Sequence, residues 1–202
     1  MAKRRAAKEP ASTREAILAA AERIVSRGGE DALSIRELCA RVGVTAPTVY
    51  HHFGDKDGLL AEVVEACFAE FDRALVAGPL PSDPVAALAW GFDRYVAYGV
   101  AHPAHYLLLF ARRRKKPTPA AITSYGRLED AIRAIEAAGR LTVPVAEAAQ
   151  AAWAAMHGVT MLAIAGFMAP DSPAARHVRD ALLAKLTTPA ARPRAATSGG
   201  AR

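Results

Sequence analysis

The stretch from Ser34 to Phe53 has the residue types and spacing of a site that contacts phosphate and base edges. It reads SIRELCARVGVTAPTVYHHF, two short segments with helical periodicity separated by Gly43. Two short helices joined by a tight turn form a helix-turn-helix, and glycine at the bend can adopt the positive φ that the turn needs. The second segment begins with short polar side chains, and a helix N-terminus offers backbone N–H groups to a phosphate. An ordinary helical hairpin is the alternative, because such turns also occur without a nucleic-acid partner.

Other kinds of chemistry have less support. His102 and His105 have the i, i+3 spacing of a metal-binding pair, but Pro103 lies between them and no carboxylate or cysteine completes a ligand set in the sequence. We therefore expect no metal ion and interpret these histidines as helix-end and pocket residues. Because no nucleophile elbow, glycine-rich phosphate loop or paired-carboxylate motif is present, we expect neither enzymatic activity nor a cofactor.

The composition favours an all-α fold. The 202 residues are 52% hydrophobic but only 6% aromatic, and alanine, which favours helices over strands, is abundant. The charged fraction of 23% is too ordinary for a disordered chain. Two cysteines cannot build a disulfide framework, and no apolar segment follows the charged first ten residues, so we expect a cytoplasmic protein. Residues 145–168 are apolar but rich in alanine, which predicts a buried helix and no membrane span.

The net charge of +6 is unevenly distributed. Basic residues gather in the N-terminal arm from Lys3 to Arg14, in the run from Arg112 to Lys116, and near the C-terminus. A flexible basic arm can reach a DNA minor groove or backbone. We interpret the run at 112–116 as a solvated helix end, because the helix dipole favours cations at a helix C-terminus. The alternative is that this run makes an additional phosphate contact.

Capping residues, glycines and prolines divide the chain into helices. Ser12 with Glu15, and Ser34 with Glu37, have the spacing of capping boxes, and Asp55 is a good N-cap for a long fourth helix. Helices are expected over 12–28, 34–42, 45–53 and 55–75, and then over 84–101, 104–111, 118–138, 144–168 and 172–187. The predicted organisation is a helix-turn-helix domain at 12–58, a helical effector-binding and dimerisation domain at 59–188, and flexible tails at 1–11 and 189–202.

Three segments resemble the DNA-binding signature of the TetR family of bacterial transcriptional regulators. They are Gly43-Val44, residues 48–53 (TVYHHF) and residues 55–60 (DKDGLL), and the resemblance covers residues 12–62. The rest of the chain is similar to the family in length and helix order. In addition, Trp153 with His157-Gly158 resembles a Trp…His-Gly pattern in the effector domain of one TetR subgroup.

The resemblance implies a homodimer that binds a palindromic double-stranded DNA operator, with the third helix in the major groove and the fourth joining head to body. Thr48 and Tyr50 would contact phosphates or base edges, and Lys56 a phosphate. Ala46 stands where some members have a polar base-reading residue, so it offers only a methyl contact. The complete predicted DNA-binding set is Arg36, Thr45, Ala46, Pro47, Thr48, Tyr50, His51, His52 and Lys56.

The resemblance also implies a small, mostly apolar effector molecule in the body. Alanine-rich helices leave volume between them, which aromatic side chains and a few polar groups could line. The predicted ligand-binding residues are Trp90, Arg94, Tyr95, Tyr106, Phe110, Tyr125, Trp153, His157 and Met161. The sequence thus predicts a ligand-responsive regulator that acts as a repressor. The alternative is a helical adaptor whose hairpin binds protein.

The last two helices are expected to form a four-helix dimer interface, because small residues allow close approach and larger apolar ones supply contact. The residues concerned are Ala148, Ala151, Ala152, Ala155, Gly158, Leu162, Val178, Ala181, Leu182, Leu183, Ala184 and Leu186.

Overall fold

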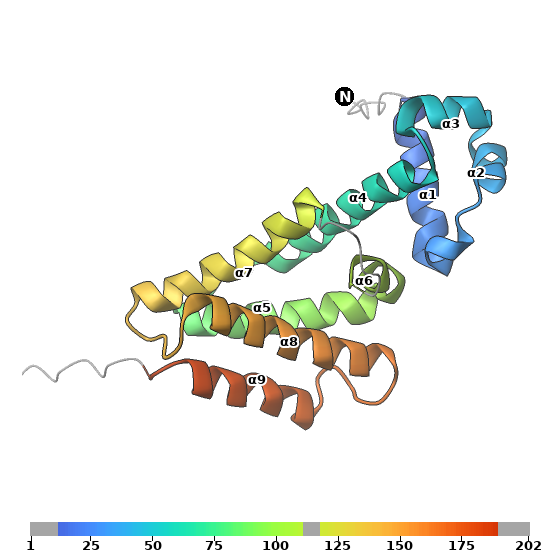
Figure 1. The fold of residues 1–202 in the computed structure, drawn as a ribbon. Coiled ribbons are helices and arrows are strands. Elements are labelled where there is room, and N and C mark those ends of the chain that lie inside the picture. Colours follow the sequence, from blue (N-terminus) through green and yellow to red (C-terminus); the bar gives the residue numbers. More distant parts are fainter. Residues whose placement is uncertain (1–11, 111–117, 190–202) are drawn as a thin grey trace, which may run out of the picture.

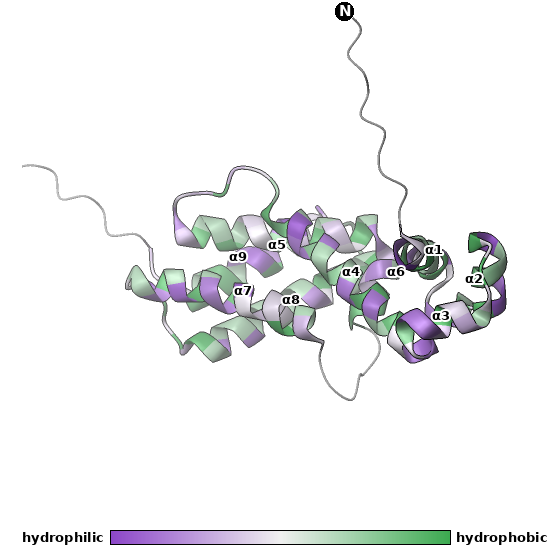
Figure 2. Cartoon of the chain, turned by 90° about the horizontal axis from the view of Figure 1, so that it is seen from above, coloured by the Kyte–Doolittle hydropathy of each residue, from purple (hydrophilic) through white to green (hydrophobic). Residues whose placement is uncertain are grey.

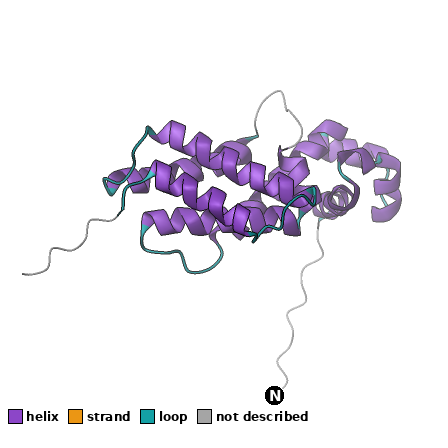
Figure 3. Cartoon of the chain, turned by 90° about the horizontal axis from the view of Figure 1, so that it is seen from below, coloured by secondary structure: helices purple, strands orange, loops and turns teal. Residues whose placement is uncertain are grey.

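The computed structural model describes residues 12–110 and 118–189. Within these ranges the chain forms α1 (Thr13–Gly28), the 3₁₀ turn η1 (Glu30–Ala32), α2 (Ile35–Val42), α3 (Ala46–Phe53), α4 (Lys56–Val76), α5 (Pro84–Ala101), α6 (Pro103–Phe110), α7 (Pro119–Ala137), α8 (Val145–Ile164) and α9 (Pro173–Leu186). Apart from one isolated bridge between Leu141 and Thr187, these residues form only helices, turns and loops (Figure 3). The predicted all-α fold is confirmed.

Most helix ends lie where the capping residues predict them. The Ser12 hydroxyl accepts from the Glu15 N–H at 3.2 Å while Glu15 Oε2 accepts from the Ser12 N–H at 2.8 Å, so the first capping box is complete. The main difference is α8, which ends at Ile164 and not near residue 168. There the N–H groups of Gly166 and Phe167 donate to the carbonyls of Ala163 and Leu162, which closes the helix. The N-terminal arm up to residue 11, the basic run at 112–116 and the tail from 190 lie outside the described residues.

The helices form a small head and a larger body. In Figure 1 the head helices α1, α2 and α3 gather at one end, and α4 leads from them to the body, where it runs beside α7. Within the body α5 contacts α4, α7, α8 and α9, so it lies at the centre of the bundle. The view in Figure 2 likewise places α1 to α3 at one end of an elongated molecule. Among the described helices, none combines the length and the apolar character needed to cross a membrane.

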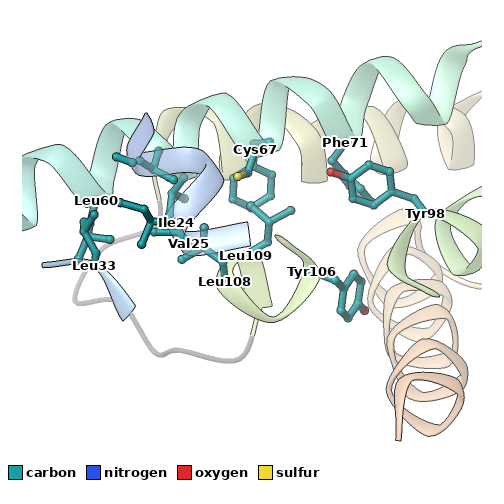
Figure 4. Close-up of a cluster of buried hydrophobic side chains, with 14 of the residues drawn as sticks. Ile24, Val25, Leu33, Leu60, Cys67, Phe71, Tyr98, Tyr106, Leu108 and Leu109 are labelled. Carbon is teal, nitrogen blue, oxygen red and sulfur yellow. The ribbon is translucent and has the colours of Figure 1, made fainter. Parts of the chain in front are cut away.

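One hydrophobic core continues from the head into the body. Figure 4 shows Ile24 and Val25 of α1 near Leu108 and Leu109 of α6, in the same run of buried side chains as Phe71 of α4. The sequence predicts only the fourth helix as the connection between head and body. The structure adds a second one, because α6 of the body packs directly on α1 of the head. A smaller core at the other end of the body contains Leu88, Ile132, Ile135, Ala148, Ala149, Leu183 and Leu186.

Candidate DNA-binding head and aromatic cluster

The turn between α2 and α3 depends on Gly43. Its backbone has φ +78° and ψ 32°, the left-handed conformation that glycine adopts without steric cost. The N–H groups of Gly43 and Val44 both donate to the carbonyl of Cys39, at 2.9 and 3.1 Å, and so end α2. The positive φ predicted for this turn is confirmed, and α3 starts three residues later.

Helix α3 has one buried face and one solvent-facing face. Val49 and Phe53 are buried in the head, whereas Tyr50 on the other side is 44% exposed. The Thr45 and Thr48 hydroxyl oxygens lie 3.0 Å apart at the N-terminus, where Thr45 is the N-cap but its side chain accepts no capping hydrogen bond. Of the nine predicted DNA-binding residues, six are exposed (Arg36, Thr45, Pro47, Tyr50, His51 and Lys56) and three are partly buried (Ala46, Thr48 and His52).

The first turn of α4 lies close against the end of α3. The Asp55 carboxylate accepts from the Gly58 N–H at 2.7 Å and so caps α4, which leaves Lys56 exposed at its first residue. A Cβ built on Gly58 would lie only 2.1 Å from the Phe53 carbonyl oxygen. The approach of the two helices therefore requires glycine at position 58, a role that the DKDGLL motif signals but sequence reasoning did not assign.

Arg14, which the sequence analysis counts with the basic arm, lies in α1 and has two contacts within the head that sequence reasoning missed. Its guanidinium lies over the Phe53 ring, 5.1 Å from the ring centre, and forms an ion pair with Glu62. This one side chain therefore joins α1 to the end of α3 and to α4. Nothing in the sequence near Arg14 indicates either contact, because both partners are distant along the chain.

In the body, several predicted ligand-binding residues form one aromatic cluster. The Tyr106 hydroxyl oxygen lies 3.0 Å from the Tyr95 hydroxyl oxygen and 2.6 Å from Nδ1 of His157. The Trp153 ring centre lies 5.9, 6.3 and 6.4 Å from those of Tyr125, His157 and Phe110. Trp153 is 40% exposed, so the cluster reaches the surface through its indole. Met161 packs partly buried against the same core.

Burial sets the protonation states of this cluster. It raises the pKa of Tyr106 to about 12 and the pKa of Tyr95 well above its ordinary value. It lowers the pKa of His157, because an imidazolium would lose hydration there. At neutral pH the cluster therefore offers uncharged hydroxyl and imidazole groups, which can hydrogen-bond a ligand from a largely aromatic wall.

Trp90 and Arg94 belong to α5, where Arg94 reaches the C-terminal end of α4. The Arg94 guanidinium stacks 4.7 Å from the centre of the Trp90 ring, and its Nε donates to the carbonyl of Ala74 at 2.8 Å. The last carbonyls of a helix lack partners within it and carry partial negative charge, so they attract a cation. The structure thus gives Arg94 a helix-capping contact, and its role in ligand binding stays a prediction.

The outer faces of α8 and α9 carry exposed apolar side chains. Leu162 is 45% exposed, Val178 38%, and Phe167 in the turn after α8 is 82% exposed. Ala148, Ala152, Leu183 and Leu186, expected in a dimer interface, are instead buried within the chain. They face inward because α8 packs on α5 and α7, and α9 on α8 and α5. The partly or fully exposed residues of the expected set are Ala151, Ala155, Gly158, Leu162, Val178, Ala181, Leu182 and Ala184.

Two protein-family models match the chain. Residues 17–63 match the one described as bacterial regulatory proteins of the tetR family, and residues 89–186 match the tetracyclin repressor-like C-terminal domain. Among curated proteins, the HTH-type transcriptional regulator EthR of Mycolicibacterium smegmatis is 29% identical over 106 residues, 50% of this chain and 48% of EthR. The matched part thus spans about half the length of this curated relative.

Solved structures share the fold over most of the chain. A protein of unknown function from Rhodococcus sp. RHA1 has a TM-score of 0.75 and 25% identity, covering 89% of this chain and 97% of the other. The multidrug binding protein EbrR, complexed with imidazole, has a TM-score of 0.69 and 22% identity, covering 90% and 94% of the two chains. Both family models and the helix-turn-helix geometry agree, and the chain belongs to the TetR family of bacterial regulatory proteins.

Proposed function

We propose that this chain is a ligand-responsive transcriptional repressor that binds a palindromic DNA operator as a homodimer. The observation that carries the proposal is the outward face of α3, which follows the left-handed turn at Gly43. Exposed there are the N-cap Thr45 and the helix residues Pro47, Tyr50 and His51. In this proposal the chain has no catalytic activity. The protein acts in the bacterial cytoplasm, where it binds DNA.

In the proposed complex α3 enters the major groove with its N-terminal residues toward the base edges. The N-terminus of α3 presents backbone N–H groups and the Thr45 and Thr48 hydroxyls to phosphate or bases. Tyr50 and Lys56 extend from the same side to backbone phosphates. Ala46 supplies a methyl group, which suits contact with thymine.

A two-fold dimer would present two such heads to two half-sites. We assign the dimer contact to the outward faces of α8 and α9, where Leu162 and Val178 leave apolar surface exposed. Isologous contact of these faces would make a four-helix interface of the expected kind, using the residues that are not already buried within the chain.

For the effector we assign the cluster of Tyr95, Tyr106, Phe110, Trp153 and His157. Its aromatic walls and its uncharged hydrogen-bonding groups suit a flat, mostly apolar molecule with one or two polar atoms. EbrR, which shares the fold, is described as a multidrug binding protein, and this supports a ligand-binding role for this chain. Trp90 and Arg94 are not part of the assignment.

The experiment that tests the repressor proposal is selection of bound fragments from random duplex DNA, followed by fluorescence anisotropy on the selected site. Tight binding to the selected duplex and much weaker binding to a scrambled duplex at physiological salt supports it. Equal binding to both would contradict it and favour the adaptor alternative, in which the same hairpin binds protein. Addition of candidate effectors to the preformed complex then tests release.

A further inference from the structure

Buried polar atoms without partners gather where α4, α5 and α6 meet. His105 is only 9% exposed, and neither of its ring nitrogens has a hydrogen-bond partner. The Tyr98 hydroxyl is also buried and without a partner, and the centre of the Tyr98 ring lies 4.7 Å from that of the His102 ring. Among the described residues, these are three of the four buried side-chain atoms that lack a partner. Native proteins rarely leave such groups unpaired, so these atoms are candidates for binding a ligand.

Three side chains at this place carry donor atoms suited to a metal ion. Glu70 reaches in from α4, with Oε2 3.7 Å from Nδ1 of His105. His102 is the C-cap of α5, and its ring lies nearly parallel to that of His105, with 5.9 Å between the ring centres. One donor atom from each of Glu70, His102 and His105 lies within 4.8 Å of the other two. Pro103 does not separate the two histidines, because it starts α6 at the corner and both rings turn to the same side.

We propose that Glu70, His102 and His105 bind a divalent transition-metal ion, with Zn²⁺ as the best fit. Two imidazole nitrogens and one carboxylate oxygen form a donor set that Zn²⁺ accepts and that Mg²⁺ and Ca²⁺, which prefer oxygen, do not favour. Three protein ligands leave a fourth position for water or another small ligand.

The corner can adjust to metal–ligand distances. Zn–N bonds measure about 2.0–2.1 Å, so the three donors must draw closer together on binding. His105 is held in the core. His102 is exposed and the Glu70 side chain is 36% exposed, so these two side chains can rotate toward His105. Cys67 is not part of the set, because its sulfur is not among the donor atoms that lie within 4.8 Å of one another.

A metal at this corner would fasten α4 to the α5–α6 junction. Helix α6 contacts α1 of the head, and Tyr106, next to His105, belongs to the aromatic cluster. The ion would therefore stabilise the part of the body through which head and effector cluster are joined. Since metal binds the folded chain, the melting temperature should rise with the metal concentration.

The test is titration of untagged, chelator-stripped protein with Zn²⁺ in a calorimeter, with Co²⁺ absorption as a second reading of the ligand environment. We expect one ion per chain and no comparable binding of Mg²⁺. Glu70→Gln and His102→Ala should each weaken Zn²⁺ binding at least about 100-fold, more than the roughly 10–100-fold cost of losing an outer-shell partner. His177→Ala, which removes an exposed histidine on α9, is the matched control and should bind as the wild type does.

His105→Ala would also open the core, so the two more exposed ligands are the decisive variants, with circular dichroism to show that both fold. Wild-type protein that binds no Zn²⁺, or variants that bind it as tightly as wild type, would overturn the proposal. Because the assay contains no DNA, its failure would leave the repressor proposal unaffected.

Discussion

The Tyr106 hydroxyl lies 2.6 Å from Nδ1 of His157, and this contact joins α6 to α8. On its other side α6 packs on α1 of the head. A ligand that displaces His157 or the adjacent Trp153 can therefore bias the head through α6 as well as through α4. The physical requirement is that the ligand binds one body conformation more tightly than the other, and a difference of about 1–3 kcal/mol changes operator affinity roughly 5- to 150-fold.

Replacing the side chains that are proposed to contact phosphate should weaken DNA binding. Tyr50→Ala should cost roughly tenfold in operator affinity, about 1.4 kcal/mol. Lys56→Ala should weaken binding to all duplexes alike. It should also reduce by about one the slope of the logarithm of the binding constant against the logarithm of the salt concentration. Anisotropy titrations over a series of salt concentrations measure both. Arg133→Ala on α7, where Arg133 forms ion pairs with Glu129 and Asp130 of the same helix, is the control, and an equal loss there would contradict the assignment.

Gly58→Ala should destabilise the head. The added methyl group would lie 2.1 Å from the Phe53 carbonyl oxygen, and overpacking of this kind costs about 1–3 kcal/mol. Gly126→Ala in α7 is the matched control, because no described atom outside the helix's own backbone lies within 4 Å of a Cβ there, and alanine should stabilise that helix by about 0.5–1 kcal/mol. Thermal unfolding distinguishes the Gly58→Ala and Gly126→Ala variants. A Gly58→Ala variant as stable as wild type would refute the close approach of α4 to the end of α3.

A charge on the outward face of α8 or α9 should yield monomers. Leu162→Asp and Val178→Asp place a carboxylate in the proposed interface, where it would be buried without a partner. Both side chains are exposed in the single chain, so the variants should still fold. Light scattering measures the mass. Ile122→Asp on α7, where the wild-type side chain is 60% exposed, should remain dimeric, and dimeric Leu162 and Val178 variants would move the interface elsewhere.

Trp153→Ala should impair the response to effector while leaving ligand-free operator binding nearly unchanged. The indole forms the exposed edge of the aromatic cluster and has no contact with the head among those described above. Thermal shift and operator release over a panel of lipophilic compounds measure the response. Trp90→Ala is the informative comparison, because Trp90 on α5 stacks with Arg94 and lies outside the assigned cluster, so this variant should keep ligand binding intact. If the Trp153→Ala variant responds to effector as the wild type does, the aromatic cluster is not the effector site.

Stability should fall below about pH 6.5 in a way that depends on His157. Burial lowers the pKa of this imidazole from its ordinary 6.5, so below that pH the unfolded chain binds a proton there that the folded chain does not. The stability that the neutral form contributes is present above pH 6.5 and is lost as the pH falls toward the folded-state value. The stability difference between wild type and His157→Gln should therefore shrink from pH 7 to pH 5 in urea unfolding. A constant difference would show that His157 does not titrate in this way.

The sequence alone determined the local features of this protein. The capping box at Ser12, the left-handed turn at Gly43 and the buried stripe of α4 each depend on residues within about one helical turn or on simple periodicity. The helix order and the helix-turn-helix could therefore be predicted, together with the exposed positions on α3. All of these are properties of single helices or of one short turn.

Only the tertiary structure decided which distant residues meet. Glu70 joins His102 and His105 because α4 passes the α5–α6 corner, and Arg94 donates to the Ala74 carbonyl because the end of α4 lies beside it. Helices α8 and α9 carry small apolar residues on several sides, so periodicity could not say which face is inward. That choice depends on how several helices pack at once, since each must bury apolar surface against neighbours that are remote in the sequence.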